Sequence, residues 1–285
     1  MPSDQGGANS LAQQRDHSYP APEPASTADQ LSAELSSRLD HCAVLLDIDG
    51  TLLDMAPTPG EVFVPAGLAA TLRGLLRRTG GALALVSGRS LYDIDLIFAP
   101  ELFPAVGGHG AEMRLAGATE TVAVSAPPLD RELKRRLAAI AQLRPGILLE
   151  DKGYSLALHY RLAPPAEAAI FQAVEAIRAD LPHLPIEILP GKFVCEIKPS
   201  GFNKATGVIQ LMQQPPFKGR LPFFIGYDVT DESVFAIMPA FGGLAFSVGR
   251  PAAGIAHQFA NPEEVRCWLA GLLAAATGTK SAHPG

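Results

Sequence analysis

The sequence predicts an α/β protein with a parallel-sheet core that is interrupted by a second, inserted α/β unit. Short apolar segments alternate with helix-like segments from residue 43 to residue 106, and the same alternation resumes at residue 203. This pattern is typical of parallel strands joined by right-handed crossovers. Between the two regions lie pairs of short strands joined by tight turns, which indicate an antiparallel sheet with helices on one face.

Composition and charge exclude several classes of protein. The 285 residues include 23 Lys and Arg against 29 Asp and Glu, a net charge of −6. This mild acidity gives no general attraction to nucleic acid or to an anionic membrane, so we expect neither as a partner. The longest apolar region, residues 234–248, is too short and too broken by Pro and Gly to span a bilayer. Three widely separated cysteines indicate no disulfide framework and no thiolate zinc site, which fits a reducing cytoplasm.

The chain divides into a leader, two core segments, the insertion and a tail. The first residues are poor in large apolar side chains and are expected to be disordered, although leucines at helical spacing predict a short helix over residues 29–39. We assign the leader to residues 1–38, the core to 39–112 and 200–275, the insertion to 113–199 and a loose tail to 276–285.

The core elements follow from compact apolar runs, which suit strands buried on both faces, and from helical periodicity. The expected core strands are 43–46, 82–86, 103–106, 223–226 and 244–248, and the expected helices are 66–78, 91–98, 204–212, 231–237 and 263–275. The insertion is expected to hold two short strands after residue 113, helices 129–143 and 166–181, and strands 147–150, 155–160, 186–189 and 193–197.

Two carboxylates, Asp47 and Asp49, directly follow the first expected strand in the segment Asp-Ile-Asp-Gly-Thr-Leu. Alternate residues of an extended segment face the same side, so both carboxylates can reach one ligand. The carboxyl ends of parallel strands are where open α/β sheets bind ligands. An isolated Asp-x-Asp more often only ends a strand and begins a turn, but this six-residue pattern is longer than a turn requires.

The second expected strand ends in Val-Ser-Gly-Arg, residues 86–89. The hydroxyl of Ser87 and the backbone N–H groups around Gly88 could bind phosphate oxygens at the beginning of a helix. The alternative is that Ser87 or Ser90 only caps that helix. Because both strands should end at the same edge of the sheet, we favour a role in binding phosphate.

Two further segments follow the insertion. Lys204 begins an expected helix, a place where the helix dipole mildly disfavours a cation, and this mismatch indicates a functional role. Residues 226–232 read Gly-Tyr-Asp-Val-Thr-Asp-Glu and bring acidic groups to the end of another strand. These groups could complete an oxygen-rich magnesium site or could cap the following helix, and the two roles are compatible.

The segment that begins at Asp47 resembles the first motif of the haloacid dehalogenase superfamily of phosphotransferases. Several further segments, in this order, make the chain similar to the trehalose-6-phosphate phosphatase family: Gly-His-Gly-Ala-Glu at 108–112, Glu-Asp-Lys-Gly at 150–153, Ala-Leu-His-Tyr-Arg at 157–161, Glu-Ile-Lys-Pro at 196–199 and Asn-Lys at 203–204. The resemblance covers residues 43–273. Each motif alone indicates only the superfamily, whereas the ordered set is specific.

The resemblance implies a Rossmann-like core with an inserted α/β cap, and a cytoplasmic phosphatase that hydrolyses trehalose 6-phosphate, the final step of trehalose biosynthesis. It implies that Asp47 attacks phosphorus, while Asp49 protonates the leaving oxygen and later activates water. Ser87, Gly88 and Lys204 would join Asp47 in binding the phosphate. An ionised aspartate can act in this way when a divalent cation offsets the repulsion between anions.

The resemblance also implies Mg²⁺ as the cofactor, and we assign Asp47, Asp49 and Asp228 to it. The family pattern reads Gly-Asp-Asp-x-Thr-Asp-Glu. Tyr227 therefore stands at a position where the family usually has an aspartate, and that aspartate would touch the metal. A phenol replaces a carboxylate poorly at neutral pH. Asp228 or Asp231 could take over its role, or metal affinity and rate could be reduced.

The inserted cap is expected to close over a small sugar phosphate. Its charged side chains offer many hydrogen-bond donors and acceptors to hydroxyl groups, although a solvated, salt-bridged face is the alternative for each of them. The residues assigned to the substrate are Arg89, Glu150, Lys152, Arg161, Lys192, Glu196 and Lys198. By the period of two along a strand, Glu196 and Lys198 are expected to lie on one face. His109 and His159 receive no proton-transfer role, because such histidines are more often ordinary half-buried residues.

Two alternatives to this function stay open at the level of sequence. The chain could be another sugar-phosphate phosphatase or a phosphohexomutase of the same superfamily. It could also be a catalytically impaired regulatory protein that binds a sugar phosphate, an alternative that rests only on Tyr227. We favour the enzyme because Asp47, Asp49, Ser87 and Lys204 are all present.

Overall fold

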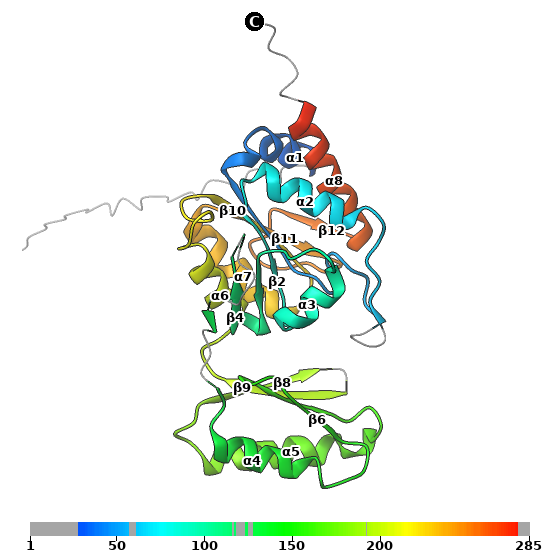
Figure 1. The fold of residues 1–285 in the computed structure, drawn as a ribbon, viewed down its shortest axis with the longest axis vertical. Helices are drawn as coiled ribbons and strands as arrows, with labels where there is room; N and C mark the ends of the chain where they lie inside the picture. Colours follow the sequence, from blue (N-terminus) through cyan, green and yellow to red (C-terminus); the bar gives the residue numbers. More distant parts are fainter. Residues whose placement is uncertain are drawn as a thin grey trace, which may run out of the picture.

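Two sheets organise the protein in the computed structural model, which describes residues 28–56, 61–115, 117, 123–124, 128–191 and 193–278. In this part of the chain, one sheet has eight strands in the order β12-β11-β10-β1-β2-β3-β4-β5, and the other has four in the order β6-β7-β9-β8. Figure 1 shows two lobes, each built on one of these sheets. The predicted α/β fold class with a parallel-sheet core is confirmed.

The larger sheet is parallel from β12 to β3, and only β4 and β5 run antiparallel to their neighbours. Its strands are β1 (Cys42–Leu46), β2 (Leu83–Val86), β3 (Ala105–Gly107), β4 (Glu112–Arg114), β5 (Ala123–Val124), β10 (Leu221–Gly226), β11 (Leu244–Val248) and β12 (His257–Phe259). In a parallel sheet of this kind the carboxyl ends of β1, β2 and β10 lie at one edge, which is where the sequence places its polar motifs.

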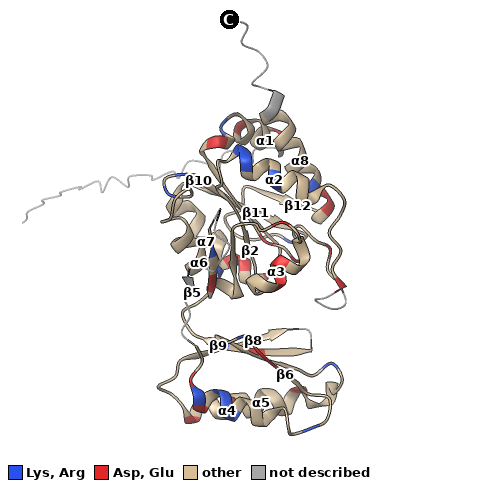
Figure 2. Ribbon diagram, viewed as in Figure 1, with Lys and Arg blue, Asp and Glu red and all other residues tan. Residues whose placement is uncertain are grey.

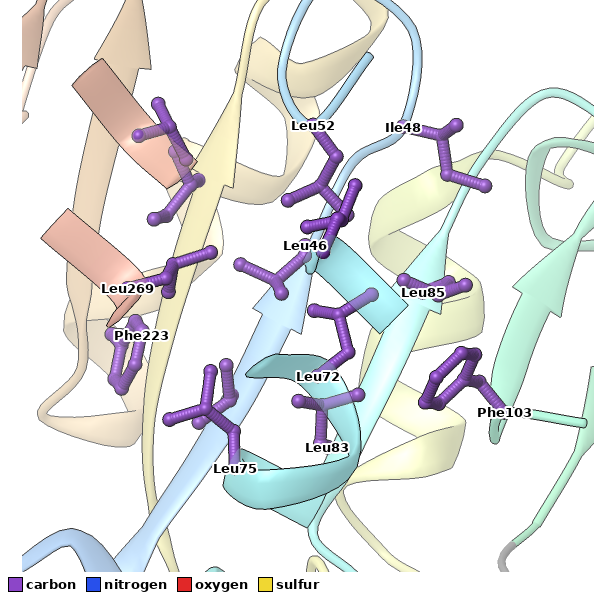
Figure 3. Packing of buried hydrophobic residues seen from close by; sticks show 14 of the residues in the cluster. Leu46, Ile48, Leu52, Leu72, Leu75, Leu83, Leu85, Phe103, Phe223 and Leu269 are labelled. Carbon is purple, nitrogen blue, oxygen red and sulfur yellow. The ribbon is translucent and has the colours of Figure 1, made fainter. Parts of the chain in front are cut away.

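Helices cover both faces of this sheet, and β1 shows why. Its side chains alternate: Cys42, Val44 and Leu46 pack in one apolar core, and Ala43 and Leu45 pack in the other. The first core is covered by α1 (Ala28–Ser37), α2 (Leu68–Arg78), α3 (Leu91–Phe98) and α8 (Pro262–Gly278), and the second by α6 (Lys204–Leu211) and α7 (Glu232–Ile237). Figure 3 shows leucines of α2 packed over leucines of β1 and β2 in the first core.

The smaller lobe is an antiparallel sheet with two helices on one face. Its strands are β6 (Leu148–Asp151), β7 (Leu156–His159), β8 (Ile186–Gly191) and β9 (Val194–Pro199), and its helices are α4 (Arg131–Ile140) and α5 (Glu167–Asp180). Figure 1 shows that the sheet lies between these helices and the larger lobe. The uncovered face of the sheet is therefore turned toward the carboxyl ends of the parallel strands.

Helix α4 lies on the side of the smaller sheet away from the larger lobe and carries several basic residues, coloured blue in Figure 2. Three of them pair with carboxylates: Lys134 with Asp151, and both Arg135 and Arg136 with Glu132. These cations are therefore engaged within the lobe and lie outside the region between the two sheets.

The structure differs from the expected segment boundaries at three places. Strands β4 and β5 fall within the assigned insertion, yet they extend the larger sheet, because residues 112–114 pair antiparallel with β3. The short helix predicted within the leader is present as α1, but it belongs to the larger lobe, because Leu31 and Leu35 are buried in the first core, where α1 packs on α8. Helix α8 continues past the assigned start of the tail, and Ala276 is buried. Residues 1–27 and 279–285 lie outside the described chain.

Two other findings concern single elements. Strand β12 was not predicted, because three residues are too few to show a periodic pattern. Within the described residues, no helix is both long and apolar enough to cross a bilayer.

The contact of α6 with the end of β3 depends on Gly207. A Cβ at this position would lie 2.5 Å from Cγ1 of Val106 and 2.9 Å from Cα of Gly110. We predict that Gly207→Ala displaces α6, and Lys204 with it, so that both the melting temperature and turnover fall. Thermal unfolding and a phosphate-release assay would measure the two effects.

The matched control for this variant is Gly271→Ala in α8, where an added Cβ meets no atom within 4 Å. Alanine is a better helix former than glycine by roughly 1 kcal/mol, so this change should raise the melting temperature. A Gly207→Ala protein that also gains stability would contradict the close contact.

Candidate active site

A cavity of about 900 Å³ lies between the two lobes and is lined by residues of both. The larger lobe contributes residues that follow β1 and β2 and the first residue of α6: Asp47, Asp49, Ser87, Gly88, Arg89 and Lys204. The parallel sheet thus brings residues that are up to 157 positions apart in the sequence to one place. A polar cavity of this kind at the carboxyl ends of parallel strands can bind an anionic ligand.

A buried charge cluster forms the floor of this cavity. The ammonium of Lys204 lies 2.7 Å from Oδ1 of Asp47 and 2.7 Å from Oδ1 of Asp231, and each of these side chains is at most 4% exposed. The hydroxyl of Thr51 donates to the other oxygen of Asp47 at 2.8 Å. These contacts hold the Asp47 carboxylate in one orientation.

The cluster carries two carboxylates and one ammonium, so it has an excess of negative charge. Burial and the nearby Asp231 raise the pKa of Asp47 to about 7, although the Lys204 ammonium lowers it. The two carboxylates in turn raise the pKa of Lys204, which stays protonated. A further cation at the cavity would stabilise Asp47 in its ionised form.

Asp49 is held in a different way, at the side of the cavity. Both of its carboxylate oxygens accept hydrogen bonds from the Arg89 guanidinium, from Nε at 2.6 Å and from Nη2 at 2.7 Å. Between the two aspartates and Leu53 the chain turns sharply, and Gly50 at this turn has a φ of 77°. A Cβ at position 50 would also lie 2.4 Å from the ring of Tyr227, so only glycine fits there.

The loop after β2 leaves Ser87 available to the cavity. Ser90 is the residue that caps α3, because its hydroxyl accepts the N–H of Asp93 at 3.1 Å. Ser87 is 1% exposed and lines the cavity, and its hydroxyl accepts the N–H of Arg89 at 3.1 Å. Of the two capping serines that the sequence allowed, the structure therefore selects Ser90.

The acidic turn after β10 separates the roles of its two aspartates. Asp228 is exposed and lines the cavity. Asp231 is fully buried, and its Oδ2 accepts the N–H groups of Tyr227 at 2.9 Å and of Asp228 at 2.8 Å. The ring of Tyr227 packs with the first apolar core and against Gly50, away from the cavity lining. Tyr227 is therefore not among the residues that line the cavity.

The residues at the cavity fit a magnesium ion with few protein ligands. Nowhere in the described part of the chain do three His, Cys, Asp or Glu side chains gather closely enough to hold a metal. Mg²⁺ commonly takes only one or two carboxylates, together with phosphate oxygens and water. Asp47 and Asp228 can supply these carboxylates. The assigned set of three, which includes Asp49, is not gathered into one such group among the described residues.

The smaller lobe lines the opposite wall with the uncovered face of its sheet. The assigned residues found there are Glu150, Lys152, Arg161 and Glu196. Glu196 accepts a hydrogen bond from the Ser155 hydroxyl at 2.8 Å and lies 3.5 Å from the Lys152 ammonium. Both contacts fix the carboxylate on the cavity wall, where it can accept hydrogen bonds from hydroxyl groups.

Two assigned substrate residues are not found at this wall. Lys198 is 3% exposed and does not line the cavity, because its ammonium pairs with Glu187 on the neighbouring strand and with the carbonyl of Phe202. The alternation of side chains along β9 correctly predicted the face of Glu196. It could not show that the long, flexible side chain of Lys198 bends away from the cavity. Lys192 lies outside the described residues.

Sequence reasoning gave no role to several residues that line the cavity. His159 lies at this wall, and its Nε2 is 2.8 Å from Oε2 of Glu150, whose pKa is lowered by this contact. Its place two residues after Ala157, within the expected strand 155–160, could have indicated that the two share a face, and both line the cavity. His109 also lines the cavity. An apolar side of the cavity consists of Met55, Val62, Phe63, Val64, Leu96 and Ile97.

Residues 45–252 match the sequence model of the family described as trehalose-phosphatase. The chain belongs to the trehalose-phosphatase family. A probable trehalose-phosphate phosphatase of Sinorhizobium fredii is 45% identical to this chain over 232 residues, which cover 81% of this chain and 86% of that protein. The trehalose-6-phosphate phosphatase of Escherichia coli is 38% identical over 237 residues, which cover 83% of this chain and 87% of that protein.

Solved structures agree with this membership of the trehalose-phosphatase family at the level of the fold. The C-terminal domain of the trehalose-6-phosphate phosphatase of Candida albicans aligns with a TM-score of 0.71 at 20% identity. The alignment covers 88% of this chain and 98% of that domain. The resemblance to this family that the ordered motifs indicated is confirmed.

We predict that Lys204→Met destabilises the fold as well as abolishing activity. Methionine retains the length of the side chain but leaves Asp47 and Asp231 buried without their counter-charge. Removing one partner of a buried ion pair costs about 3–5 kcal/mol, which denaturant unfolding would measure. The exposed Lys218→Met is the matched control and should change the unfolding free energy by less than about 0.5 kcal/mol. Equal stability of the two variants would contradict the buried cluster.

Proposed function

We propose that this member of the trehalose-phosphatase family hydrolyses trehalose 6-phosphate to trehalose and phosphate. The observation that carries this function is the buried carboxylate of Asp47, held by Lys204 and Thr51 on the floor of a cavity whose opposite wall is polar. The floor offers a nucleophile and cationic donors to a phosphate, and the wall offers donors and acceptors to sugar hydroxyl groups. The names of the curated relatives support the same substrate.

In the first step, an oxygen of Asp47 attacks phosphorus and the bond between phosphorus and the sugar oxygen breaks. The sugar oxygen leaves with a proton from Asp49, and trehalose is released. Lys204, Ser87 and the N–H groups of the loop at Gly88 bind the non-bridging phosphate oxygens, on which negative charge develops. These phosphate-binding groups are already in place, whereas Asp49 must be freed from Arg89 at one oxygen to carry the proton that it gives to the sugar oxygen.

In the second step, water attacks the phosphorus of the aspartyl phosphate and gives up a proton to Asp49. Phosphate leaves and Asp47 regains its free carboxylate, so the protein returns to its starting state. Asp49 must therefore release at least one oxygen from Arg89 during the cycle. A bound phosphate offers the guanidinium a second anion at the same cavity, which makes this exchange of partners possible.

Mg²⁺ would be held by Asp47 and Asp228 at the cavity floor. When bound, it supplies positive charge that offsets the repulsion between the carboxylate and the phosphate. This role matches the excess negative charge of the Asp47, Lys204 and Asp231 cluster. Tyr227 does not reach the cavity lining and takes no part in holding the ion.

The cap carries the discrimination between sugars. Glu150, Lys152, Arg161 and Glu196 lie on the face that looks toward the phosphate site, and the cavity of about 900 Å³ is large enough for a disaccharide. The apolar side of the cavity complements the C–H faces of sugar rings. Free thiols at Cys42, Cys195 and Cys267 support our further proposal that the enzyme works in the cytoplasm.

We predict that Asp47→Asn abolishes hydrolysis of trehalose 6-phosphate while preserving the fold. The amide has nearly the same shape as the carboxylate but is no nucleophile, so turnover should fall by a factor on the order of 10⁴ or more. Phosphate release would measure turnover, and circular dichroism would show that the fold is retained. Activity of the variant at the wild-type rate would overturn the assignment of Asp47.

The same assay tests substrate and cofactor in the wild-type protein. Trehalose 6-phosphate should be preferred to glucose 6-phosphate and to other sugar phosphates, and a chelator should remove the activity until Mg²⁺ is restored. Preference for a different sugar phosphate would contradict the proposed substrate. Turnover that is unchanged by chelation would contradict the proposed cation.

We further predict that Glu196→Gln raises the KM for trehalose 6-phosphate by roughly tenfold or more, with a smaller effect on kcat. The amide retains an acceptor for Ser155 but loses the charge that orients Lys152. Hydrolysis of phenyl phosphate, which has no sugar, should stay near the wild-type rate. Glu175→Gln, on the helix-covered side of the cap, is the matched control and should leave both substrates unaffected.

A further inference from the structure

We propose that His109 is a substrate-contacting residue that forms a hydrogen bond with the sugar where it joins the phosphate. This inference rests on the proposed function and extends it to a residue on the loop after β3. The loop comprises Gly108, His109 and Gly110 and lies where the phosphate site, the cap and the beginning of α6 meet.

The backbone of this loop is fastened to the phosphate-binding loop after β2. The N–H of Gly108 donates to the carbonyl of Arg89 at 2.7 Å, and the N–H of His109 donates to the carbonyl of Ser87 at 3.1 Å. His109 has a φ of 53° and lies between two glycines that also have positive φ. A histidine in this left-handed conformation is uncommon, which indicates that its surroundings hold it there.

The imidazole of His109 lies directly against the phosphate-binding loop. A Cβ at position 88 would lie 2.5 Å from both Cε1 and Nε2 of the ring, so only glycine at this position leaves room for it. Both Gly88 and His109 line the cavity. The ring is therefore placed next to the site that we assign to the phosphate oxygens.

The same loop also touches the other two parts of the site. A Cβ at position 108 would lie 2.1 Å from the hydroxyl of Tyr154, a buried residue of the cap. A Cβ at position 110 would lie 2.2 Å from the carbonyl oxygen of Asn203, which precedes Lys204. A sugar that connects the phosphate on the floor with Glu196 and Lys152 on the cap must pass this junction.

The protonation state of His109 suits a contact with a sugar hydroxyl group. Burial, together with the nearby Lys204, Lys198 and Lys152, lowers its pKa to about 4 against the opposing effect of Glu196. A neutral imidazole has one nitrogen that donates and one that accepts a hydrogen bond. It can bind a sugar oxygen in either role without adding charge beside the phosphate.

The test is the variant His109→Asn, assayed with two substrates. Asparagine tolerates positive φ, so the backbone of the loop can persist while the ring is lost. The KM for trehalose 6-phosphate should rise about tenfold, as expected for one lost hydrogen bond, whereas kcat/KM for phenyl phosphate should change by less than about twofold. His183→Asn, at an exposed turn of the cap, is the control and should match the wild type.

An unchanged KM for trehalose 6-phosphate would overturn the proposal, and so would equal losses with both substrates, because the latter would indicate a structural role only. If the wild-type protein does not hydrolyse trehalose 6-phosphate at all, the proposed function itself fails, and the control assay shows this separately. These outcomes are therefore distinguishable.

A crystal structure of Asp47→Asn with trehalose 6-phosphate tests the contact without altering His109, and it applies even if the His109 variant does not fold. An imidazole nitrogen within about 3.2 Å of a substrate oxygen would support the proposal. A ring that makes no hydrogen bond with the substrate in that complex would overturn it.

Discussion

The ammonium of Lys204 between the carboxylates of Asp47 and Asp231 is the interaction on which the rest of the site depends. It joins the end of β1, the beginning of α6 and the turn after β10 in one buried place. Three charges can be buried together only because each has a partner at hydrogen-bond distance. The cluster therefore holds Asp47, the proposed nucleophile, in one orientation, and its excess negative charge is consistent with the proposed cation beside it.

The two lobes divide the chemistry of the reaction between them. The larger lobe places Asp47, Asp49 and Lys204 on rigid strand and helix ends, where the groups that make and break bonds keep a fixed geometry. The smaller lobe presents Glu196 and its neighbours on the open face of an antiparallel sheet, which offers hydrogen-bonding groups at regular spacing. The loop at His109 touches both lobes, so the proposed sites for the sugar and for the phosphate meet there.

Sequence reasoning was most successful where a periodic pattern coincided with burial. Apolar runs predicted β1, β2 and β11 closely, and helix α3 has the expected bounds. Reasoning was weaker where long-range pairing decided the outcome. Strands β4 and β5 were expected in the insertion, but they extend the edge of the larger sheet, where β4 pairs with β3. No local sequence pattern indicates which strand will pair with β4. Side-chain alternation likewise predicted one face for Glu196 and Lys198, but only Glu196 lines the cavity.

The sequence by itself determined the α/β class, the family and the set of polar groups at the strand ends, because these follow from local periodicity and ordered motifs. Only the tertiary structure decided that Asp231 pairs with Lys204 while Asp228 lines the cavity, and that the ring of Tyr227 packs on Gly50. The physical reason is that such choices depend on which side chains become buried together. A buried charge takes whatever partner the packing brings within reach, and no spacing along the chain specifies that partner.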